Sequence, residues 1–171
     1  TFGKEEGQIP GYPGHQEIEL ALVKLFRLTG EEKYLKTANY FIEERGTSPS
    51  YFEKERASRQ HRPEFFPEFA NLDLNYMQAD KPPVQQEKAE GHAVRAVYMY
   101  SAMADLALEY GDPELMKACT RLWDNLTQKQ MYLTGSIGSS GFLERFTTDF
   151  DLPNQSNYSE TCASIGLMMF G

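Results

Sequence analysis

Two stretches of the chain share one pattern, a pair of amphipathic helices joined by a very short turn. The first pair is expected from 15 to 45 and the second from 91 to 126, and a glycine, Gly30 or Gly111, marks each turn. Glycine ends a helix readily because it adopts the left-handed conformation of a C-cap. In the second pair, Asp112 and Pro113 then supply a cap and a first helical residue. Connections this short make the two helices of each pair antiparallel neighbours.

Apolar residues recur at helical spacing through both pairs, and a further helix is expected to begin at Tyr158. Cys119 falls in one of these stripes and is expected in the core. The predicted fold is therefore all-α, and repeated helical hairpins point to a toroid or solenoid of helix pairs. The stripes consist of Ile18, Ala21, Leu22, Leu25 and Leu28; Tyr34, Leu35, Ala38, Phe41 and Ile42; Val94, Val97, Tyr98, Ala102 and Leu106; and Leu115, Met116, Cys119, Leu122, Trp123 and Leu126.

Long irregular segments separate the helical pairs. Residues 1–14 are rich in glycine and proline, and residues 131–157 form a second loop around a glycine-rich turn. Residues 47–88 carry prolines that forbid a long helix, but also many aromatic residues. We therefore expect an ordered excursion that packs over one end of the domain. Its prolines are Pro49, Pro63, Pro67, Pro82 and Pro83, and its aromatic residues are Tyr51, Phe52, Phe65, Phe66, Phe69 and Tyr76.

Composition excludes some classes of function. The formal net charge of −8 argues against a protein that binds nucleic acid electrostatically. No apolar stretch is long enough to cross a bilayer, and two cysteines do not make a disulfide framework. The chain opens with neither a methionine nor a signal peptide, so it is expected to be an excerpt or a processed product, with a cytoplasmic location favoured.

Polar side chains fall at the leading end of the first helix in each unit. His15 and His92 follow matched glycines, and Glu160 and Cys162 stand where the helix from Tyr158 begins. If the leading helices form the inner ring of a toroid, these ends face one side and the side chains share a pocket. The alternatives are buried, hydrogen-bonded histidines without a chemical role, and a solvated glutamate beside a structural cysteine.

The spacing of Glu160 and Cys162 sets a condition on the backbone. Zinc binds both carboxylate oxygen and thiolate sulfur, so the two residues are candidate ligands. On a regular helix, residues i and i+2 point about 200° apart. The two side chains therefore converge only if the backbone is still extended or turning at Glu160, and the irregular run 151–157 supplies that lead-in.

Five short motifs are spread over nearly the whole chain. They are GYPGHQEIELAL at 11–22, GHAVRAVY at 91–98, YLTGSIGS at 132–139, DFDLPN at 149–154 and YSETCASIG at 158–166. In this order and combination they resemble the motifs of glycoside hydrolase family 127, the β-L-arabinofuranosidase family.

The resemblance implies an (α/α)6 barrel that hydrolyses β-L-arabinofuranosides or related sugars with retention, through a zinc-bound cysteine nucleophile. The family holds its zinc with one glutamate and three cysteines, and Glu160 and Cys162 match the glutamate and the first cysteine. Glu144 matches the general acid/base, and His15 and His92 match histidines that contact the sugar. In such a mechanism Glu144 would protonate the departing oxygen and then activate water.

The other two cysteines of the family, one of them the nucleophile, have no counterpart in this sequence. Residues 1–171 are therefore expected to be a partial (α/α)6 catalytic domain that cannot catalyse hydrolysis alone. A partial toroid would expose apolar inner surface, so the chain alone is expected to be unstable or to associate with other copies. The stretch 78–86, QADKPPVQQ, departs from the family's Gln-Ala-His-x-Pro-Val-Arg-Glu-Gln, which leaves the sugar open.

Two other classes of function stay open. The first is an (α/α)6 enzyme that works without zinc, such as an unsaturated-glycuronide hydrolase or an epimerase. The second is a non-enzymatic scaffold of helical hairpins that binds a peptide. Zinc analysis separates the first from a family 127 enzyme, and a Glu144→Gln variant separates the second, because a scaffold needs no acid at 144.

Overall fold

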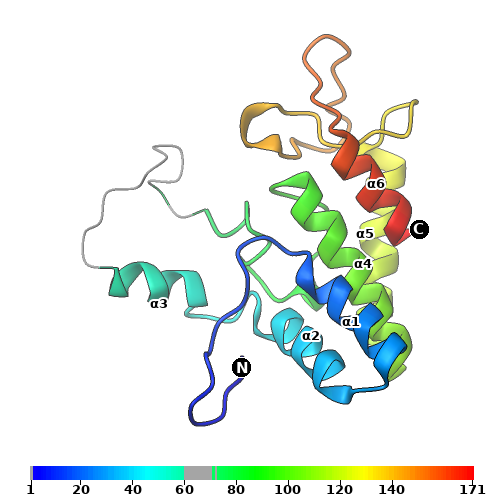
Figure 1. Ribbon diagram of the computed structural model, residues 1–171. Coiled ribbons are helices and arrows are strands. Elements are labelled where there is room, and N and C mark those ends of the chain that lie inside the picture. The colour runs from blue at the N-terminus through cyan, green and yellow to red at the C-terminus, as the bar shows by residue number, and fades with distance from the viewer. Residues whose placement is uncertain (1, 60–70, 72) are drawn as a thin grey trace.

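The computed structural model describes residues 2–59, 71 and 73–171, and these residues are helical with long loops (Figure 1). Within these ranges no β-strand forms, and single-residue bridges are the nearest approach to one. The all-α prediction is therefore confirmed for this part of the chain. The α-helices are α1 (Ile18–Thr29), α2 (Glu32–Glu44), α3 (Tyr51–Ser58), α4 (Ala93–Tyr110), α5 (Pro113–Asn125) and α6 (Thr161–Phe170). Shorter helical turns are η2 (Pro83–Gln85), η3 (Leu126–Gln130) and η4 (Phe142–Glu144).

Both predicted hairpins form, and their turns use the expected residues. Gly30 and Gly111 are left-handed C-caps with φ of 73° and 63°. The Asp112 side chain accepts hydrogen bonds from the backbone N–H groups of Glu114 and Leu115, so it caps α5. These contacts satisfy backbone groups that a helix end otherwise leaves without partners.

The predicted start of the first helix at His15 is wrong, because α1 begins at Ile18. Glu17 has φ of −168°, which is extended backbone outside the helical region. The preceding Gln16 is fully buried, and its side chain is bonded to a distant loop at Met77 and Gln78. This tertiary contact holds the chain out of the helical path, and the apolar periodicity does not record it.

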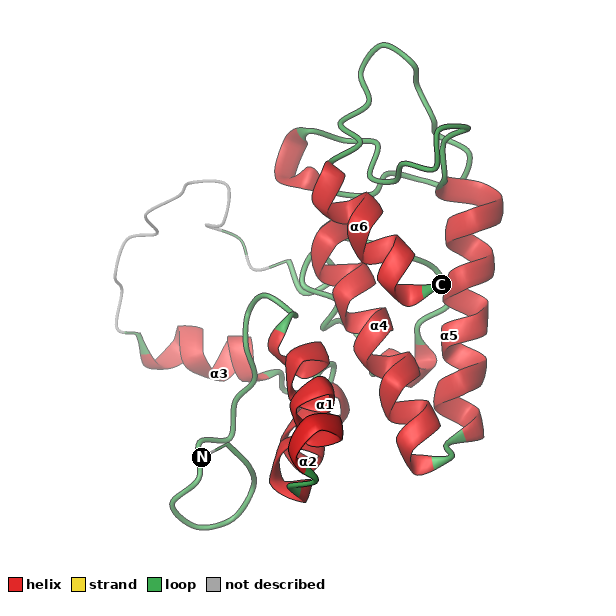
Figure 2. Ribbon diagram, turned by 45° about the vertical axis from the view of Figure 1, so that its right-hand side comes forward, coloured by secondary structure: helices red, strands yellow, loops and turns green. Residues whose placement is uncertain are grey.

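The helices form two layers. The first helices of successive units, α1, α4 and α6, lie side by side with their leading ends toward the same end of the molecule (Figures 1 and 2). The second helices lie behind them, with α2 against α1 and α4, and α5 against α4. This is the relation that an arc of a helical toroid requires. A closed (α/α)6 barrel stays a prediction.

Helix α4 is the centre of the core. Its side chains Met99, Tyr100 and Met103 are fully buried, and they pack with the apolar faces of the other helices. Helix α6 approaches α4 closely because it has a glycine at the contact: a Cβ on Gly166 would lie 2.3 Å from Cγ2 of Val97. Backbones can approach this closely only where no side chain stands between them.

In its described part, the excursion 47–88 contains a helix that the sequence analysis missed. Helix α3 begins with a capping box in which Glu53 N donates to Ser50 Oγ (3.1 Å) and Ser50 N donates to Glu53 Oε2 (2.7 Å). Phe52 packs with Tyr12 and Phe41 in a second apolar cluster. The predictions for Pro63, Pro67, Phe65, Phe66 and Phe69 lie outside the described residues.

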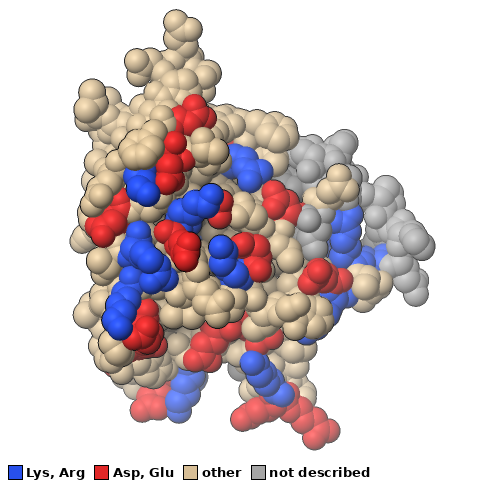
Figure 3. All heavy atoms as spheres, turned by 180° about the vertical axis from the view of Figure 1, so that it is seen from behind, with Lys and Arg blue, Asp and Glu red and all other residues tan. Residues whose placement is uncertain are grey.

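The surface of the described residues carries charges of both signs. On the face opposite that of Figure 1, acidic and basic side chains are interleaved (Figure 3). Among the described residues, no helix has the length and apolar character needed to span a membrane.

Candidate active site

The leading ends of the inner helices carry the predicted site residues. His15 lies just before α1, and His92 is the N-cap of α4. Glu160 is the N-cap of α6, and Cys162 lies in its first turn. Glu144 comes from η4 in the loop above these ends. Because α1, α4 and α6 are neighbours that run in the same direction, these positions meet at one end of the bundle (Figure 1).

The two histidines face each other. Their ring centroids lie 5.7 Å apart in an edge-to-face arrangement. His92 Nε2 lies 3.1 Å from Glu144 Oε2, so the imidazole pair continues directly to the carboxylate. Placement of the histidines on the opposite side of the molecule from Glu144 would have contradicted a shared pocket, and the structure brings them together.

Backbone contacts fix which nitrogen of each histidine carries its proton. Arg95 N donates to His92 Nδ1 (3.4 Å) as part of the α4 cap, so His92 Nδ1 is an acceptor and its Nε2–H donates to Glu144. His15 Nδ1 lies 3.0 Å from the carbonyl oxygen of Gln16, which can only accept. In the neutral ring, His15 Nε2 is then the acceptor. The pair therefore combines one N–H donor and one acceptor.

Glu144 is held in an unusual backbone conformation. Leu143 and Glu144 both have positive φ, 57° and 52°, which residues with a Cβ seldom adopt. Ser140 and Arg145 exchange two backbone hydrogen bonds of 3.1 Å that close the turn, and Phe146 N donates to Gly91 O (2.9 Å). These bonds pin the turn to the residue before His92.

A second side chain holds the Glu144 carboxylate. Tyr158 O–H donates to Glu144 Oε1 at 2.9 Å, while His92 Nε2–H donates to Oε2. Each carboxylate oxygen therefore accepts one hydrogen bond, and the Glu144 side chain keeps 41% of its surface exposed. A carboxylate held this way can exchange a proton with a group that approaches from the open side.

Burial and a neighbouring cation keep both imidazoles neutral. Burial, followed by the charge of Arg95, lowers the pKa of His92 to about 4 even though Glu144 acts in the opposite direction. The same two causes lower the pKa of His15. The Arg95 guanidinium lies 4.9 Å from the centre of the Tyr76 ring, and its Nε and Nη1 are buried without a hydrogen-bond partner.

Glu160 and Cys162 meet the backbone condition for convergence. Glu160 has φ of −60° and ψ of 135°, so the chain is still extended there and becomes helical only at the next residue. A hydrogen bond to Glu160 and the charge of Glu160 raise the pKa of the Cys162 thiol, which places the two side chains together. Cys162 is exposed, and Glu160 Oε2 is buried without a hydrogen-bond partner.

Tyr98 connects this pair with the histidines. Its ring centroid lies 6.3 Å from that of His15. Its pKa is raised by burial and further by the charges of Glu17, Cys162 and Glu160. All the predicted site residues therefore belong to one region. In the part of the chain that the structure describes, no group of three or more His, Cys, Asp and Glu residues could hold a metal.

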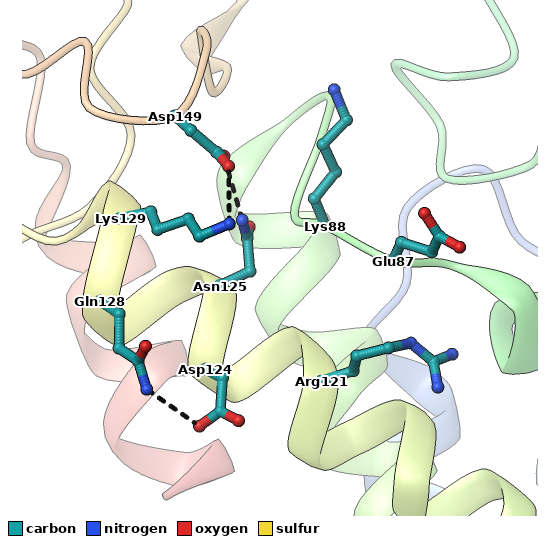
Figure 4. Close-up of a pocket in the computed structure, with 8 residues that line it drawn as sticks. All are labelled: Glu87, Lys88, Arg121, Asp124, Asn125, Gln128, Lys129 and Asp149. Carbon is teal, nitrogen blue, oxygen red and sulfur yellow. Dashed lines mark hydrogen bonds and ion pairs between the residues drawn. The ribbon is translucent and has the colours of Figure 1, made fainter.

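One cavity in the described part of the chain is a different feature. Its volume is about 340 Å³. None of the predicted site residues lines it, and within it Asp149 contacts Lys129 at 3.3 Å and accepts from Asn125 at 3.0 Å (Figure 4). Its other lining residues are Glu87, Lys88, Arg121, Asp124 and Gln128. It has no histidine and no cysteine, so it offers none of the chemistry of the site at the helix ends.

Comparison with known families assigns the whole chain. The profile of the family described as "Beta-L-arabinofuranosidase, GH127 catalytic domain" matches residues 1–171. The chain belongs to family GH127. Its relatives include a protein named non-reducing end beta-L-arabinofuranosidase from Bifidobacterium longum subsp. longum, 42% identical over 170 residues. That match covers 99% of this chain and 26% of the relative.

Solved GH127 structures give the same result. A GH127 β-L-arabinofuranosidase from Geobacillus stearothermophilus T6 is 54% identical with a TM-score of 0.93, over 99% of this chain and 26% of that one. A GH127 beta-arabinofuranosidase is 42% identical with a TM-score of 0.81, over 98% and 23%. The chain thus spans about a quarter of the length of these relatives. The suspected family is confirmed, and the helical architecture matches part of the GH127 catalytic domain.

Sequence reasoning missed several partners of the GH127 site residues. Tyr158 stands inside the quoted motif 158–166, but nothing in the spacing relates it to Glu144. Arg95 and Tyr98 lie in the motif 91–98, three and six residues after His92. A spacing of three shares a helix face with the first residue, so helical periodicity was the available signal for Arg95, whereas Tyr98, six residues after His92, lies about 120° away around the helix and had no such signal.

Proposed function

We propose that this chain is part of a retaining glycoside hydrolase that acts on β-L-arabinofuranosides or related sugars. Its membership of GH127 and the activity named for its relatives support the substrate class. The observation that carries the proposal is the Glu144 carboxylate, held between Tyr158 and His92 and open on one side. Family membership favours this function over an enzyme of another (α/α)6 class and over a peptide-binding scaffold.

Glu144 is proposed as the general acid/base. A protonated Glu144 would donate to the departing glycosidic oxygen, and the resulting carboxylate would accept a proton from water in the second step. Tyr158 and the neutral His92 both donate hydrogen bonds to the ionised Glu144 carboxylate. These bonds stabilise the carboxylate between the two steps. The nucleophile of the family has no counterpart in residues 1–171, and the chain alone is expected to be inactive.

His15 and His92 are proposed to contact the sugar. A sugar hydroxyl can donate to the free Nε2 acceptor of His15, whereas His92, whose ring centroid lies 5.7 Å away, already donates its Nε2–H to Glu144 and would meet the sugar beside that carboxylate. Their lowered pKa values keep both groups uncharged at neutral pH. Neutral imidazoles bind a neutral sugar without the cost of burying a charge.

Glu160 and Cys162 are proposed to bind zinc. The buried Glu160 Oε2 without a hydrogen-bond partner and the exposed thiol beside it fit a metal that takes oxygen and sulfur ligands. Two donors are half of a tetrahedral site, and the family resemblance places the other two ligands on cysteines that have no counterpart in residues 1–171. When bound, zinc would keep the sulfur of an attached cysteine deprotonated.

The assay uses the full-length protein that carries this chain and two aryl β-L-arabinofuranosides that differ in leaving group. Glu144→Gln should lower turnover of the substrate with the poor leaving group by roughly a hundredfold to ten-thousandfold, and that of the nitrophenyl substrate less, because only the poor leaving group needs a proton. An equal loss with both substrates would contradict the acid role. Absence of turnover by the unmodified protein would contradict the function itself.

Zinc is tested separately by metal analysis. The purified full-length protein should contain stoichiometric zinc, and Cys162→Ser should lose it. The matched control is Cys119→Ser, since Cys119 is buried in the core and contacts no site residue in the described chain. Full zinc content in the Cys162→Ser variant would show that the ligand assignment is wrong.

A further inference from the structure

A buried amide side chain ties down the peptide that carries His92. Gln78 is 2% exposed, and its Nε2 donates to the carbonyl oxygens of Glu90 (2.7 Å), Tyr76 (3.2 Å) and His92 (3.3 Å). Its own backbone has a positive φ of 51°. A strained backbone conformation persists where surrounding contacts hold it in place. Here the hydrogen bonds of Gln78 hold its side-chain amide against the start of α4.

A second buried amide does the same for His15. Gln16 follows His15 directly and is fully buried. Its Nε2 donates to Gln78 Oε1 (2.9 Å) and to Met77 O (3.1 Å), and its backbone carbonyl lies 3.0 Å from His15 Nδ1. The side chains of Gln16 and Gln78 therefore join the peptide that precedes α1 to the N-cap of α4.

Backbone shape confirms that this junction is tight. Gly91, which precedes His92, has φ of +72°. A Cβ at this position would lie 2.7 Å from Gln78 Nε2 and 2.4 Å from the carbonyl oxygen of Asn75. The loop that carries Gln78 thus packs directly on the backbone that leads into His92.

We infer that Gln16 and Gln78, the amide pair, are positioning residues that set the separation and orientation of His15 and His92 for the sugar. This inference rests on the proposed function. Neither glutamine is exposed, so neither touches substrate, and each acts through the imidazole whose peptide it holds. A misplacement of about 1 Å in a catalytic group costs roughly a hundredfold in rate. Loss of the direct bond between the two amides frees one imidazole to shift against the other.

The test replaces each amide by an apolar side chain of similar length in the full-length protein. Gln78→Met and Gln16→Met should each lower kcat/KM for an aryl β-L-arabinofuranoside by roughly tenfold to a hundredfold, measured well below the unfolding midpoint. Because the two amides share the bond between Gln16 Nε2 and Gln78 Oε1, the fold loss of the double variant should be smaller than the product of the two single losses. If Gln78→Met does not fold, the Gln16→Met variant is sufficient for the test.

Gln130→Met is the matched control. Gln130 is 5% exposed, and its Nε2 donates to Ala89 O and Asn125 Oδ1, both at 2.8 Å. It is a buried glutamine near the same loop without a bond to the peptide of either histidine. The control should lower the unfolding midpoint and leave kcat/KM unchanged. A loss of activity in Gln130→Met equal to that in Gln78→Met would overturn the inference, because the removal of any buried amide would then lower activity by the same amount.

A second arm separates positioning from general damage. In a His92→Ala background, Gln78→Met should lower kcat/KM by less than about twofold, because the side chain that it positions is gone. The same fold loss in both backgrounds would overturn the inference and leave the proposed function intact. Absence of turnover by the unmodified protein would instead overturn the proposed function, and the inference with it.

Discussion

Acidification should destabilise this fold through His92, and the size of the effect follows from its surroundings. Burial and the charge of Arg95 lower the pKa of His92 to about 4, and the nearby His15 acts in the same direction while Glu144 opposes them. In the unfolded chain a histidine has a pKa of about 6.5. The unfolded state therefore binds more protons between these two values, and the free energy of unfolding falls as pH falls through this window.

The magnitude can be worked out from the two pKa values. Above pH 6.5, His92 is neutral in both states and makes no pH-dependent contribution. As pH falls, keeping it neutral in the folded state costs about 2 kcal/mol at pH 5 and approaches about 3 kcal/mol below pH 4, where the cost levels off. His92 is 7% exposed, so solvent screening reduces these figures little.

The assay compares the unmodified full-length protein with a His92→Gln variant by urea unfolding at pH 7 and pH 5. Glutamine has one acceptor and one donor end, so it can replace the contacts of His92 with Arg95 N and Glu144 without titrating. The carboxylates titrate in both proteins, and their contributions to the pH dependence of stability cancel in the comparison. Between pH 7 and pH 5 the variant should lose about 2 kcal/mol less stability than the unmodified protein.

Two results would refute this reasoning. Equal losses in both proteins would mean that the pKa of His92 is the same in the folded and unfolded states. A smaller loss in the unmodified protein would mean that the pKa of His92 is raised, as in an ion pair with Glu144 across their 3.1 Å contact. The acceptor role assigned to His92 Nδ1 would then be wrong, because both ring nitrogens would carry protons.

Two further predictions concern the frame of the site. Arg45 is fully buried and lies 3.9 Å from the equally buried Glu19, so Arg45→Met should cost about 3–5 kcal/mol in urea unfolding by leaving a buried charge unpaired. The double variant with Glu19→Gln should recover part of this loss, and no recovery would show that the charge is not the cause. Gly91→Ala should lower the thermal midpoint far more than Gly30→Ala. Both glycines have φ near +73°, but of these two only Gly91 would place a Cβ against backbone, 2.4 Å from Asn75 O. Equal shifts would contradict the close approach.

The sequence was sufficient for the helical hairpins because each is specified locally. Apolar periodicity defines the helix faces, and Gly30, Gly111 and Asp112 end or begin helices through contacts within a few residues. Helix α3 was missed although Ser50 and Glu53 form a capping box that is visible in the sequence. The nearby prolines dominated the prediction, whereas they restrict only the residues around themselves.

The site was predictable in part for the same reason. The repeat places His15 and His92 at matched helix ends, so their proximity follows from packing neighbouring hairpins. The contact between Tyr158 and Glu144 does not follow, because it depends on a loop in which two residues with a Cβ have positive φ. Such a conformation is disfavoured locally and is held by tertiary bonds, which local patterns in a single sequence do not reveal.

Helix N-caps explain why the chemistry gathers at these ends. A cap residue has its backbone fixed by the helix that follows, while its side chain stays outside the helix. His92 uses Nδ1 to cap α4 and so aims Nε2–H at Glu144, whereas Glu160 makes no side-chain cap bond to α6 and leaves Oε2 without a partner. The positive end of a helix dipole disfavours an imidazolium and favours the negative charge of a carboxylate. The same structural position therefore suits a neutral donor in one repeat and a carboxylate in the next, so a repeated hairpin can bring unlike residues together at one end.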